Sequence, residues 1–228
     1  MGTKKEKTPI IWRTTHESLK RRWKIRFLLM NGLYLTVFLT MGLGLLYYEN
    51  TRQCFLEKQK ELDVLKAKEH IYSIFKSKGI SLSQGLDIAD VTIRQSKELG
   101  LSVPLILAIM KKESLFSTHA VSSQNAMGLM QLHPMTWQEY VGKLKLTIPP
   151  DGAFDPVANI VVATHLLSDL QQYYQKNSKS EEELWQSVLS AYYSGITSLS
   201  QTGITKSHIR YVADVSRFKK EFDETFQN

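Results

Sequence analysis

Residues 104–114 read PLILAIMKKES, and this stretch decides the fold. On a helix, Ile106, Ile109 and Met110 stand at positions i, i+3 and i+4, so they share one face. Glu113 continues the same row at i+7. A carboxyl group on the core-facing row of an apolar helix is costly when it is ionised and unpaired. We therefore expect burial to raise the pKa of Glu113, so that it can donate a proton near neutral pH. The alternative is a Glu at a helix end that turns into solvent.

Helical patterns also flank this stretch. A helix ending at Gly100 precedes it, and helices over about residues 157–174 and 181–193 follow it. After residue 85 the sequence has no alternating run rich in Val, Ile or Thr between hairpin turns, so strands are not expected. We therefore predict a mainly α fold for residues 85–228.

Residues 27–48 read FLLMNGLYLTVFLTMGLGLLYY, a run of 22 residues without a charge. About 20 such residues span a bilayer as a helix. Arg and Lys precede the run and two Tyr end it, so the positive-inside rule places the N-terminus in the cytoplasm. We expect a single membrane pass, with residues 49–228 on the outer side. A cleaved signal peptide is the alternative, but its apolar region is shorter, about 7–15 residues, and ends in an A-x-A-like site.

The net charge of +7 is concentrated at the N-terminus. Residues 1–26 contain nine Lys or Arg against two Asp or Glu, whereas residues 85–228 carry a net charge of −2. A nucleic-acid-binding domain is expected to carry its basic patch on the folded part. We therefore interpret residues 1–26 as a basic cytoplasmic tail and expect no nucleic-acid partner.

Residues 49–84 connect the membrane segment to the predicted domain and indicate a membrane-proximal helix followed by a linker. Apolar residues recur there at spacings near three, four and seven, at Phe55, Leu62, Leu65, Tyr72 and Phe75. This narrow stripe suits either a dimeric coiled coil or packing on the chain's own domain, and the sequence leaves both open. Cys54 is the only cysteine, so no intramolecular disulfide can form.

Two further segments carry residue types suited to sugar binding. In residues 122–132, SSQNAMGLMQL, Gly128 between bulky neighbours indicates a close approach of the backbone. Gln131 in the same segment offers both donors and an acceptor to a sugar hydroxyl or N-acetyl group. Residues 190–195, SAYYSG, end a predicted helix at a glycine and present two aromatic rings.

Together these segments resemble the lytic transglycosylases of the soluble, goose-lysozyme-like type, over roughly residues 86–215. The family pattern is a Glu-Ser pair after an apolar helix, a Ser-x-x-Gly-Ala-x-Gly-Leu-Met-Gln segment, a later Ala-Tyr-Asn-Ala-Gly and a Tyr near the end. The same order appears here at Glu113-Ser114, residues 122–131, residues 191–195 and Tyr211. The resemblance implies a lysozyme-like helical domain. It also implies that the membrane pass crosses the bacterial inner membrane and that the domain lies in the periplasm.

The chain departs from that pattern at three positions. Asn125 replaces a Gly, which is a mild change because Asn tolerates the left-handed backbone region. Tyr193 and Ser194 replace Asn and Ala in the third motif. This change in the third motif removes an amide that in the family lies near the cleft, so it bears on substrate contacts rather than on the reaction.

The resemblance implies a mechanism with one carboxyl group. Glu113 would protonate the glycosidic oxygen between N-acetylmuramic acid and N-acetylglucosamine of peptidoglycan, and would then act as the base that closes a 1,6-anhydro ring. Tyr211 would hydrogen-bond Glu113. The remaining residues implied to contact sugar or orient the acid are Ser114, Ser122, Met130, Gln131 and Tyr192.

Metal and cofactor chemistry find no support in the sequence, and we expect no cofactor. The six His residues show no H-x-x-x-H spacing, and no Gly-x-Ser-x-Gly elbow or phosphate-binding Gly-rich loop occurs. Two alternatives stay open. One is a lysozyme-like hydrolase on the same scaffold, and the other is a non-catalytic peptidoglycan-binding scaffold in an envelope or secretion assembly.

Overall fold

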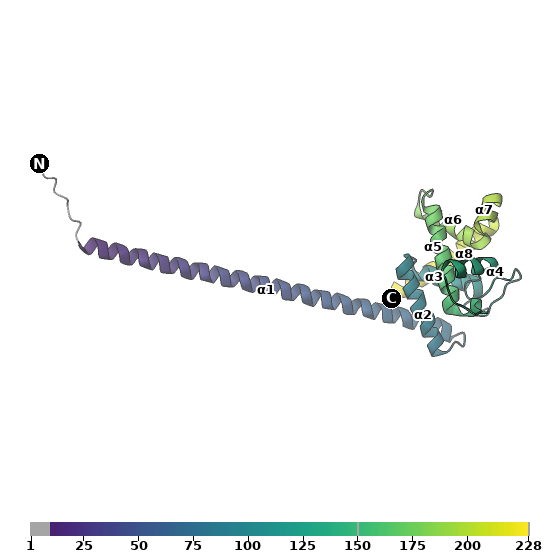
Figure 1. The fold of residues 1–228 in the computed structure, drawn as a ribbon, viewed down its shortest axis with the longest axis horizontal. Helices are drawn as coiled ribbons and strands as arrows, with labels where there is room; N and C mark the ends of the chain where they lie inside the picture. The colour runs from purple at the N-terminus through teal and green to yellow at the C-terminus, as the bar shows by residue number, and fades with distance from the viewer. Residues whose placement is uncertain (1–9, 150, 228) are drawn as a thin grey trace. The chain divides into compact units, whose positions relative to one another are not determined.

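The structure, a computed structural model, describes residues 10–149 and 151–227 and consists of helices joined by short loops (Figure 1). The helices are α1 (Ile10–Lys76), α2 (Leu82–Leu99), α3 (Val103–Ser114), α4 (Pro134–Lys143), the short 3-10 helix η1 (Gly152–Phe154), α5 (Pro156–Gln175), α6 (Glu181–Ser194), α7 (Ile196–Thr202) and α8 (Lys206–Gln227). Apart from two isolated bridges at Met127, the described residues form no strand. The prediction of a mainly α fold is confirmed.

The chain divides into two compact units, and the boundary falls inside α1. The first unit comprises residues up to Glu61, and the second begins at Leu62. The sequence led us to expect the folded domain to begin at residue 85, so the structure adds the end of the membrane-proximal helix to it.

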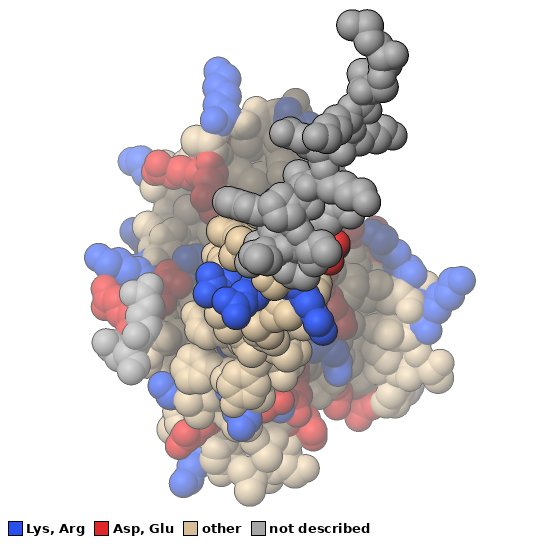
Figure 2. Space-filling view, turned by 90° about the vertical axis from the view of Figure 1, so that its left-hand side faces the viewer, with Lys and Arg blue, Asp and Glu red and all other residues tan. Residues whose placement is uncertain are grey.

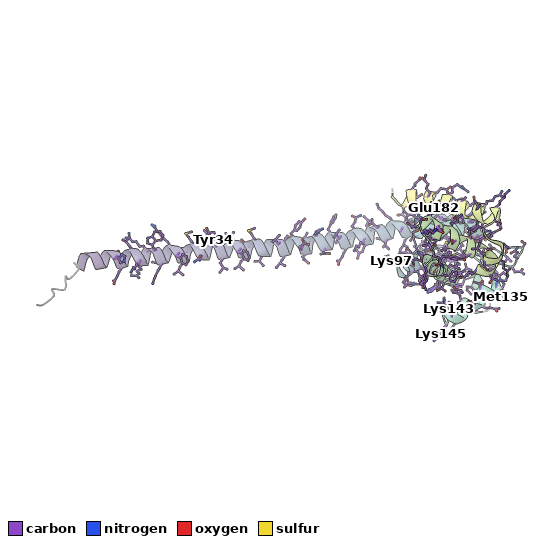
Figure 3. All side chains as sticks on the ribbon, turned by 90° about the horizontal axis from the view of Figure 1, so that it is seen from above. Tyr34, Lys97, Met135, Lys143, Lys145 and Glu182 are labelled. Carbon is purple, nitrogen blue, oxygen red and sulfur yellow. The ribbon has the colours of Figure 1, made fainter. Side chains whose placement is uncertain are left out.

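In the first unit, α1 carries apolar side chains on all its sides. Phe27, Phe38 and Leu46 are each about two-thirds exposed or more. Figure 3 shows side chains projecting from this helix around Tyr34, which is 66% exposed. By length and composition this helix can cross a membrane, and its most apolar window is not buried at all. Residues 1–9 of the predicted basic tail lie outside the described residues.

In the second unit, the last turns of α1 pack into the domain core. Ile71 and Phe75 are fully buried, and the Phe75 ring meets the Phe116 ring edge-on at 5.4 Å. Gly85 of α2 leaves room for the Tyr72 ring, because a Cβ at Gly85 would come within 2.6 Å of that ring. Of the membrane-proximal stripe, Tyr72 and Phe75 therefore pack on the chain's own domain, one of the two arrangements the sequence left open. Phe55, Leu62 and Leu65 are exposed.

Helix α3 forms the centre of the second unit. The six consecutive residues Leu105–Met110 are all buried, which is typical of a helix surrounded on every side. It packs most extensively against α8 and also contacts α2. Ser102 caps its N-terminus by accepting a hydrogen bond from the Leu105 N–H. Burial is therefore wider than the single predicted row of Ile106, Ile109 and Met110.

Helices α5 and α6 begin at residues whose side chains cap them. Asp155 caps α5 by accepting a hydrogen bond from the Ala158 N–H at 2.7 Å, and Ser180 caps α6 in the same way. Gly195 ends α6 with a positive φ of 82°, as the sequence predicted. Helix α6 packs against α5 and α8, so the C-terminal ends of α3 and α6 both lie beside α8.

Charged side chains do not form one basic surface on the face drawn in Figure 2. Blue Lys and Arg side chains there are interspersed with red Asp and Glu.

Candidate active site

Glu113 lies in the last turn of α3, at the end of its apolar core. The left-handed backbone of Leu115 (φ 51°) ends the helix directly afterwards. The Glu113 side chain is partly buried, and its Oε1 accepts a hydrogen bond from Tyr211 Oη at 2.5 Å. The contact between these two residues that the resemblance implied is therefore present.

Three influences set the protonation state of Glu113. Burial raises the pKa of Glu113 from 4.5 to about 7, whereas the hydrogen bond from Tyr211 and the charge of Lys112 lower it. Because burial is the largest influence, a substantial fraction of the molecules hold a proton on Glu113 near neutral pH. This is the state that a general acid needs, and it agrees with the expectation from the sequence.

The two lysines before Glu113 are paired with α8 rather than with the acid. Lys112 Nζ lies 2.7 Å from Asp214 Oδ2, and Lys111 Nζ lies 2.6 Å from Glu221 Oε2. These partly exposed ion pairs keep both ammonium groups engaged elsewhere. Lys112 therefore lowers the pKa of Glu113 without cancelling the effect of burial.

A second carboxyl group does not act on Glu113 among the described residues. Glu139 and Asp151, the acids nearest in sequence to the motifs, are both exposed, and neither is among the groups that shift the pKa of Glu113. The structure thus presents one enclosed acid rather than the facing pair that most glycosidases use.

Two tyrosines lie near the acid, Tyr211 buried and Tyr192 partly buried. Tyr211 of α8 is 2% exposed, and burial together with the nearby Glu113 raises its pKa well above the ordinary value. Burial and Glu113 raise the pKa of Tyr192 of α6 in the same direction. Both phenols therefore stay protonated, so Tyr211 Oη remains a donor to Glu113 and Tyr192 Oη donates to the Met130 carbonyl at 2.8 Å.

The segment of residues 127–131 is anchored by a buried side chain of α5. Asn159 Oδ1 accepts from the Met130 N–H at 2.8 Å, while its Nδ2 donates to the carbonyls of Met127 and Ala153. A Cβ at Gly128 would lie 2.3 Å from the Ala153 carbonyl oxygen and 2.4 Å from Asn159 Nδ2. Only glycine fits there, and the predicted close approach of the backbone at Gly128 is confirmed.

Gln131 and Ser114 are the predicted contact residues whose hydrogen bonds tie this segment to its neighbours. Gln131 Nε2 donates to the carbonyls of Ala120 and Gly128, which leaves its Oε1 as the group without a hydrogen bond among the described residues. Ser114 Oγ donates to the Leu129 carbonyl at 2.7 Å, so it joins the end of α3 to the segment. Ser114 therefore orients the helix end that bears Glu113.

Ser122 and Met130 occupy structural positions instead. Ser122 Oγ accepts hydrogen bonds from the N–H groups of Gln124 and Ala126, which closes a turn around Asn125 (φ 61°). The Met130 side chain is fully buried, so it faces the core and not solvent, because Asn159 and Tyr192 hold its backbone from both sides. A sugar contact by the Met130 side chain, as the resemblance implied, does not fit this placement.

Sequence reasoning missed His208, which was considered only as a metal ligand. His208 is 4% exposed, and its Nε2 lies 2.9 Å from Ser194 Oγ in the third motif. Its position three residues before Tyr211 places both on one face of α8, and this spacing was readable from the sequence. Among the described residues no group of three His, Cys, Asp or Glu could hold a metal ion.

An open cavity of about 810 Å³ lies at the other ends of these helices. Leu105 of α3 and Leu184 of α6 line it, about two turns from Glu113 and Tyr192 along the respective helices. It is therefore separate from the acid, and the tyrosines and the 127–131 segment define the candidate site.

Comparison with known proteins agrees with this geometry. The family described as "Transglycosylase SLT domain" matches residues 90–209. The membrane-bound lytic murein transglycosylase C of Edwardsiella ictaluri is 36% identical over 113 residues, which is 48% of this chain and 32% of that protein. The protein of that name from Yersinia enterocolitica is 38% identical over 111 residues, 47% of this chain and 31% of its own. The chain spans about a third of the length of these relatives.

Two solved structures share the fold. An inactive variant of the lytic transglycosylase Slt from Pseudomonas aeruginosa aligns with a TM-score of 0.53 and 22% identity, covering 60% of this chain and 24% of its own. The 70-kDa soluble lytic transglycosylase in complex with bulgecin A aligns with a TM-score of 0.52 and 21% identity, covering 61% of this chain and 24% of that one. At this identity the likeness concerns the fold, and it confirms the expected lysozyme-like helical domain.

Proposed function

The chain belongs to the transglycosylase SLT domain family, and we propose that it is a membrane-anchored enzyme that cleaves the glycan strands of bacterial peptidoglycan. The observation that carries the proposal is Glu113, whose pKa burial raises to about 7 and whose Oε1 Tyr211 holds. An enclosed acid of this kind has no use in a protein that only binds, so the catalytic reading is preferred over a scaffold.

In the first step, Glu113 acts as the general acid. Its protonated carboxyl donates to the oxygen between N-acetylmuramic acid and N-acetylglucosamine, and that bond breaks as positive charge develops at the anomeric carbon. The Glu113 carboxylate that remains is stabilised by the hydrogen bond from Tyr211 Oη and by the charge of Lys112. The two influences that lower the pKa of Glu113 therefore favour the step.

In the second step, the same carboxylate acts as the base. It takes the proton from the C6 hydroxyl of the muramic acid, and that oxygen attacks the anomeric carbon to close a 1,6-anhydro ring. The proton returns to Glu113, so the acid is ready for another cycle and no water is consumed. A single carboxyl group, as found in the described site, suffices for both steps.

The neighbouring residues would position the sugar and the acid. We assign the free Oε1 of Gln131 to a sugar hydroxyl or N-acetyl N–H, because its Nε2 is already engaged with two carbonyls. Tyr192 and Ser114 would hold the 127–131 segment against the helix end that bears Glu113. In this assignment Ser122 and Met130 contribute backbone shape rather than side-chain contacts.

We place residues 27–48 in the inner membrane, the N-terminus in the cytoplasm and the unit from Leu62 onward in the periplasm, where peptidoglycan lies. Support comes from the uncharged helix, its exposed apolar surface and the basic residues that precede it. A peptidoglycan-cleaving unit on the other side would have no access to its substrate.

The test of activity uses the full chain in detergent micelles with purified peptidoglycan. Mass spectrometry of the released fragments should show muramic acid ends lighter than hydrolysed ends by one water. Glu113→Gln should lower the rate by about 10²–10⁴-fold, the usual contribution of a general acid and base. Glu139→Gln, which changes an exposed acid, is the matched control and should keep the wild-type rate.

Each other outcome selects a different function. Hydrolysed ends would identify a lysozyme-like hydrolase on this scaffold. Binding to peptidoglycan without release of fragments would point to a scaffold of an envelope or secretion assembly. Undiminished cleavage by Glu113→Gln would remove Glu113 from the mechanism.

The topology has an independent test in Cys54, the only cysteine and an exposed one. Cys54 follows the uncharged run by a few residues, so a membrane-impermeant maleimide should label it in spheroplasts. A Cys54→Ser chain with His16→Cys moves the thiol to the other flank and should be labelled only after lysis. The reverse pattern would invert the proposed topology.

A further inference from the structure

The corner formed by α6, α7 and α8 holds an aromatic residue that the family pattern does not have. Tyr193 of α6 is 48% exposed, and its ring lies 4.9 Å from the Tyr211 ring at an angle of 30°. The Tyr211 hydroxyl is the group that donates to Glu113. An exposed aromatic ring therefore contacts the residue that hydrogen-bonds the acid.

A buried histidine, one turn before Tyr211 on α8, also packs against this ring. The His208 ring meets the Tyr193 ring nearly at right angles, with centroids 5.5 Å apart. The Tyr193 ring thus packs against two rings of α8, tilted against Tyr211 and edge-on against His208, at centroid distances that aromatic pairs prefer. Its two neighbours restrict the ring while almost half of its surface stays open.

The hydrogen bonds of His208 determine its tautomer and its orientation. Its Nδ1 accepts from the Thr205 N–H at 3.1 Å, so Nδ1 carries no proton. The proton therefore resides on Nε2, which donates to Ser194 Oγ at 2.9 Å. Ser194 in turn donates to the Ser190 carbonyl of its own helix at 3.2 Å. Both ring nitrogens are engaged, so the imidazole cannot rotate without losing a buried hydrogen bond.

Tyr193 and Ser194, the two residues that depart from the third family motif, thus act together. Ser194 supplies the acceptor that holds His208, and Tyr193 supplies the ring that His208 supports. If Tyr193 served only to fill space at the surface, it would gain little from packing against His208, a buried residue whose two ring nitrogens are both hydrogen-bonded. The arrangement instead presents a fixed, open aromatic face.

We propose that Tyr193 is a sugar-binding platform beside Glu113, and that His208 and Ser194 are positioning residues that hold its ring. The C–H groups on one face of a pyranose ring pack well on an aromatic face, which is the contact that the lost Asn could not offer. The ligand class is an N-acetylated hexosamine strand, and this inference rests on the proposed function.

Binding is measured with the full chain in detergent and with Glu113→Gln present, so that the ligand is not consumed. The probe is a tetrasaccharide of alternating N-acetylglucosamine and N-acetylmuramic acid, titrated by calorimetry. Tyr193→Leu should weaken binding about tenfold, whereas Tyr193→Phe and Tyr193→Trp, which keep a ring, should bind within about twofold of the parent. Tyr173→Leu, at another exposed tyrosine (59%), is the matched control.

The double change Tyr193→Asn with Ser194→Ala restores the two family residues, so the fold accommodates it even if Tyr193→Leu fails to fold. It should also bind about tenfold more weakly, because the platform is gone. His208→Phe keeps a ring but loses both hydrogen bonds, and we expect binding about threefold weaker. Unchanged binding by Tyr193→Leu, or by the double variant, overturns the proposal.

Kinetics with Glu113 present separate a platform from a merely structural role. If Tyr193 is a platform, Tyr193→Leu raises KM and leaves kcat and the pH profile unchanged; if Tyr193 acts through Tyr211, Tyr193→Leu lowers kcat and moves the pH limb. A lower kcat together with a shifted pH limb would overturn the proposal that Tyr193 is a sugar-binding platform. Failure of the wild-type chain to cleave peptidoglycan, with the binding differences intact, would instead remove the proposed activity and leave the sugar site.

Discussion

Two apolar helical segments of this chain have opposite surroundings. In α1 the uncharged run of residues 27–48 exposes its side chains on all sides, whereas in α3 the run Leu105–Met110 is buried on all sides. Composition alone does not distinguish them. The difference lies in length and in partners, because α3 is covered by α2 and α8 while the run in α1 has no protein partner among the described residues. By length and composition, this run is a candidate membrane span.

The difference between the two segments can be tested by placing one carboxylate in each of them. Leu107→Asp should unfold the second unit, because an unpaired charge in the core costs at least about 5 kcal/mol. Leu39→Asp should leave the melting of that unit unchanged and lower membrane insertion by about 3 kcal/mol. Circular dichroism in detergent and membrane fractionation measure the two effects, and equal loss of structure in both variants would contradict the distinction.

The same comparison can be made within α1, which crosses the boundary between the two units. Phe75→Ala should destabilise the second unit by about 3–5 kcal/mol, because Phe75 is fully buried against Phe116. Phe55→Ala, at a side chain 66% exposed, is the control and should not change the denaturant midpoint. Similar midpoints for both variants would mean that the end of α1 is not part of the core. Fragments beginning at residue 80 should share the defect of Phe75→Ala.

The acid at the end of α3 should make the second unit less stable as the pH rises. The pKa of Glu113 is raised from 4.5 to about 7, so between these values the unfolded chain loses a proton that the folded chain keeps. Stability is therefore lost across that window, by about 3 kcal/mol in total. Glu113→Gln should raise the melting temperature above about pH 7 and have little effect near pH 4. Glu57→Gln, at an exposed acid of α1, should have no effect at either pH; a gain at low pH alone would contradict the sign.

The smallest effect concerns the hydrogen bond between α8 and that acid. Tyr211→Phe removes an influence that lowers the pKa of Glu113, so the alkaline limb of the activity profile should move upward by about one pH unit. The rate should fall as well, because the Glu113 carboxylate formed in the first step loses a donor. Tyr34→Phe on α1 is the matched control and should leave the profile in place. A downward movement of the limb would show that Tyr211 favours the protonated acid instead.

Much of the site was predictable because it depends on residues that are close together in the sequence. The row Ile106, Ile109, Met110 and Glu113 depends only on helical spacing, and the close approach at Gly128 depends on a small residue between large ones. The partners of those residues come from distant parts of the sequence. Asn159 lies 29 residues after Met130, whose N–H it binds, and Tyr211 lies 98 residues after Glu113, so no local pattern predicts these contacts.

The sequence by itself determined the helical class of the protein, the uncharged membrane-length run and the position of Glu113, because periodicity and charge are properties of neighbouring residues. Only the tertiary structure decided that α1 ends inside the domain core, that Met130 faces inward and that His208 supports Tyr193. These outcomes depend on which surfaces meet when helices pack. A side chain's burial is set by its neighbours in space, and its own spacing along the chain does not specify them.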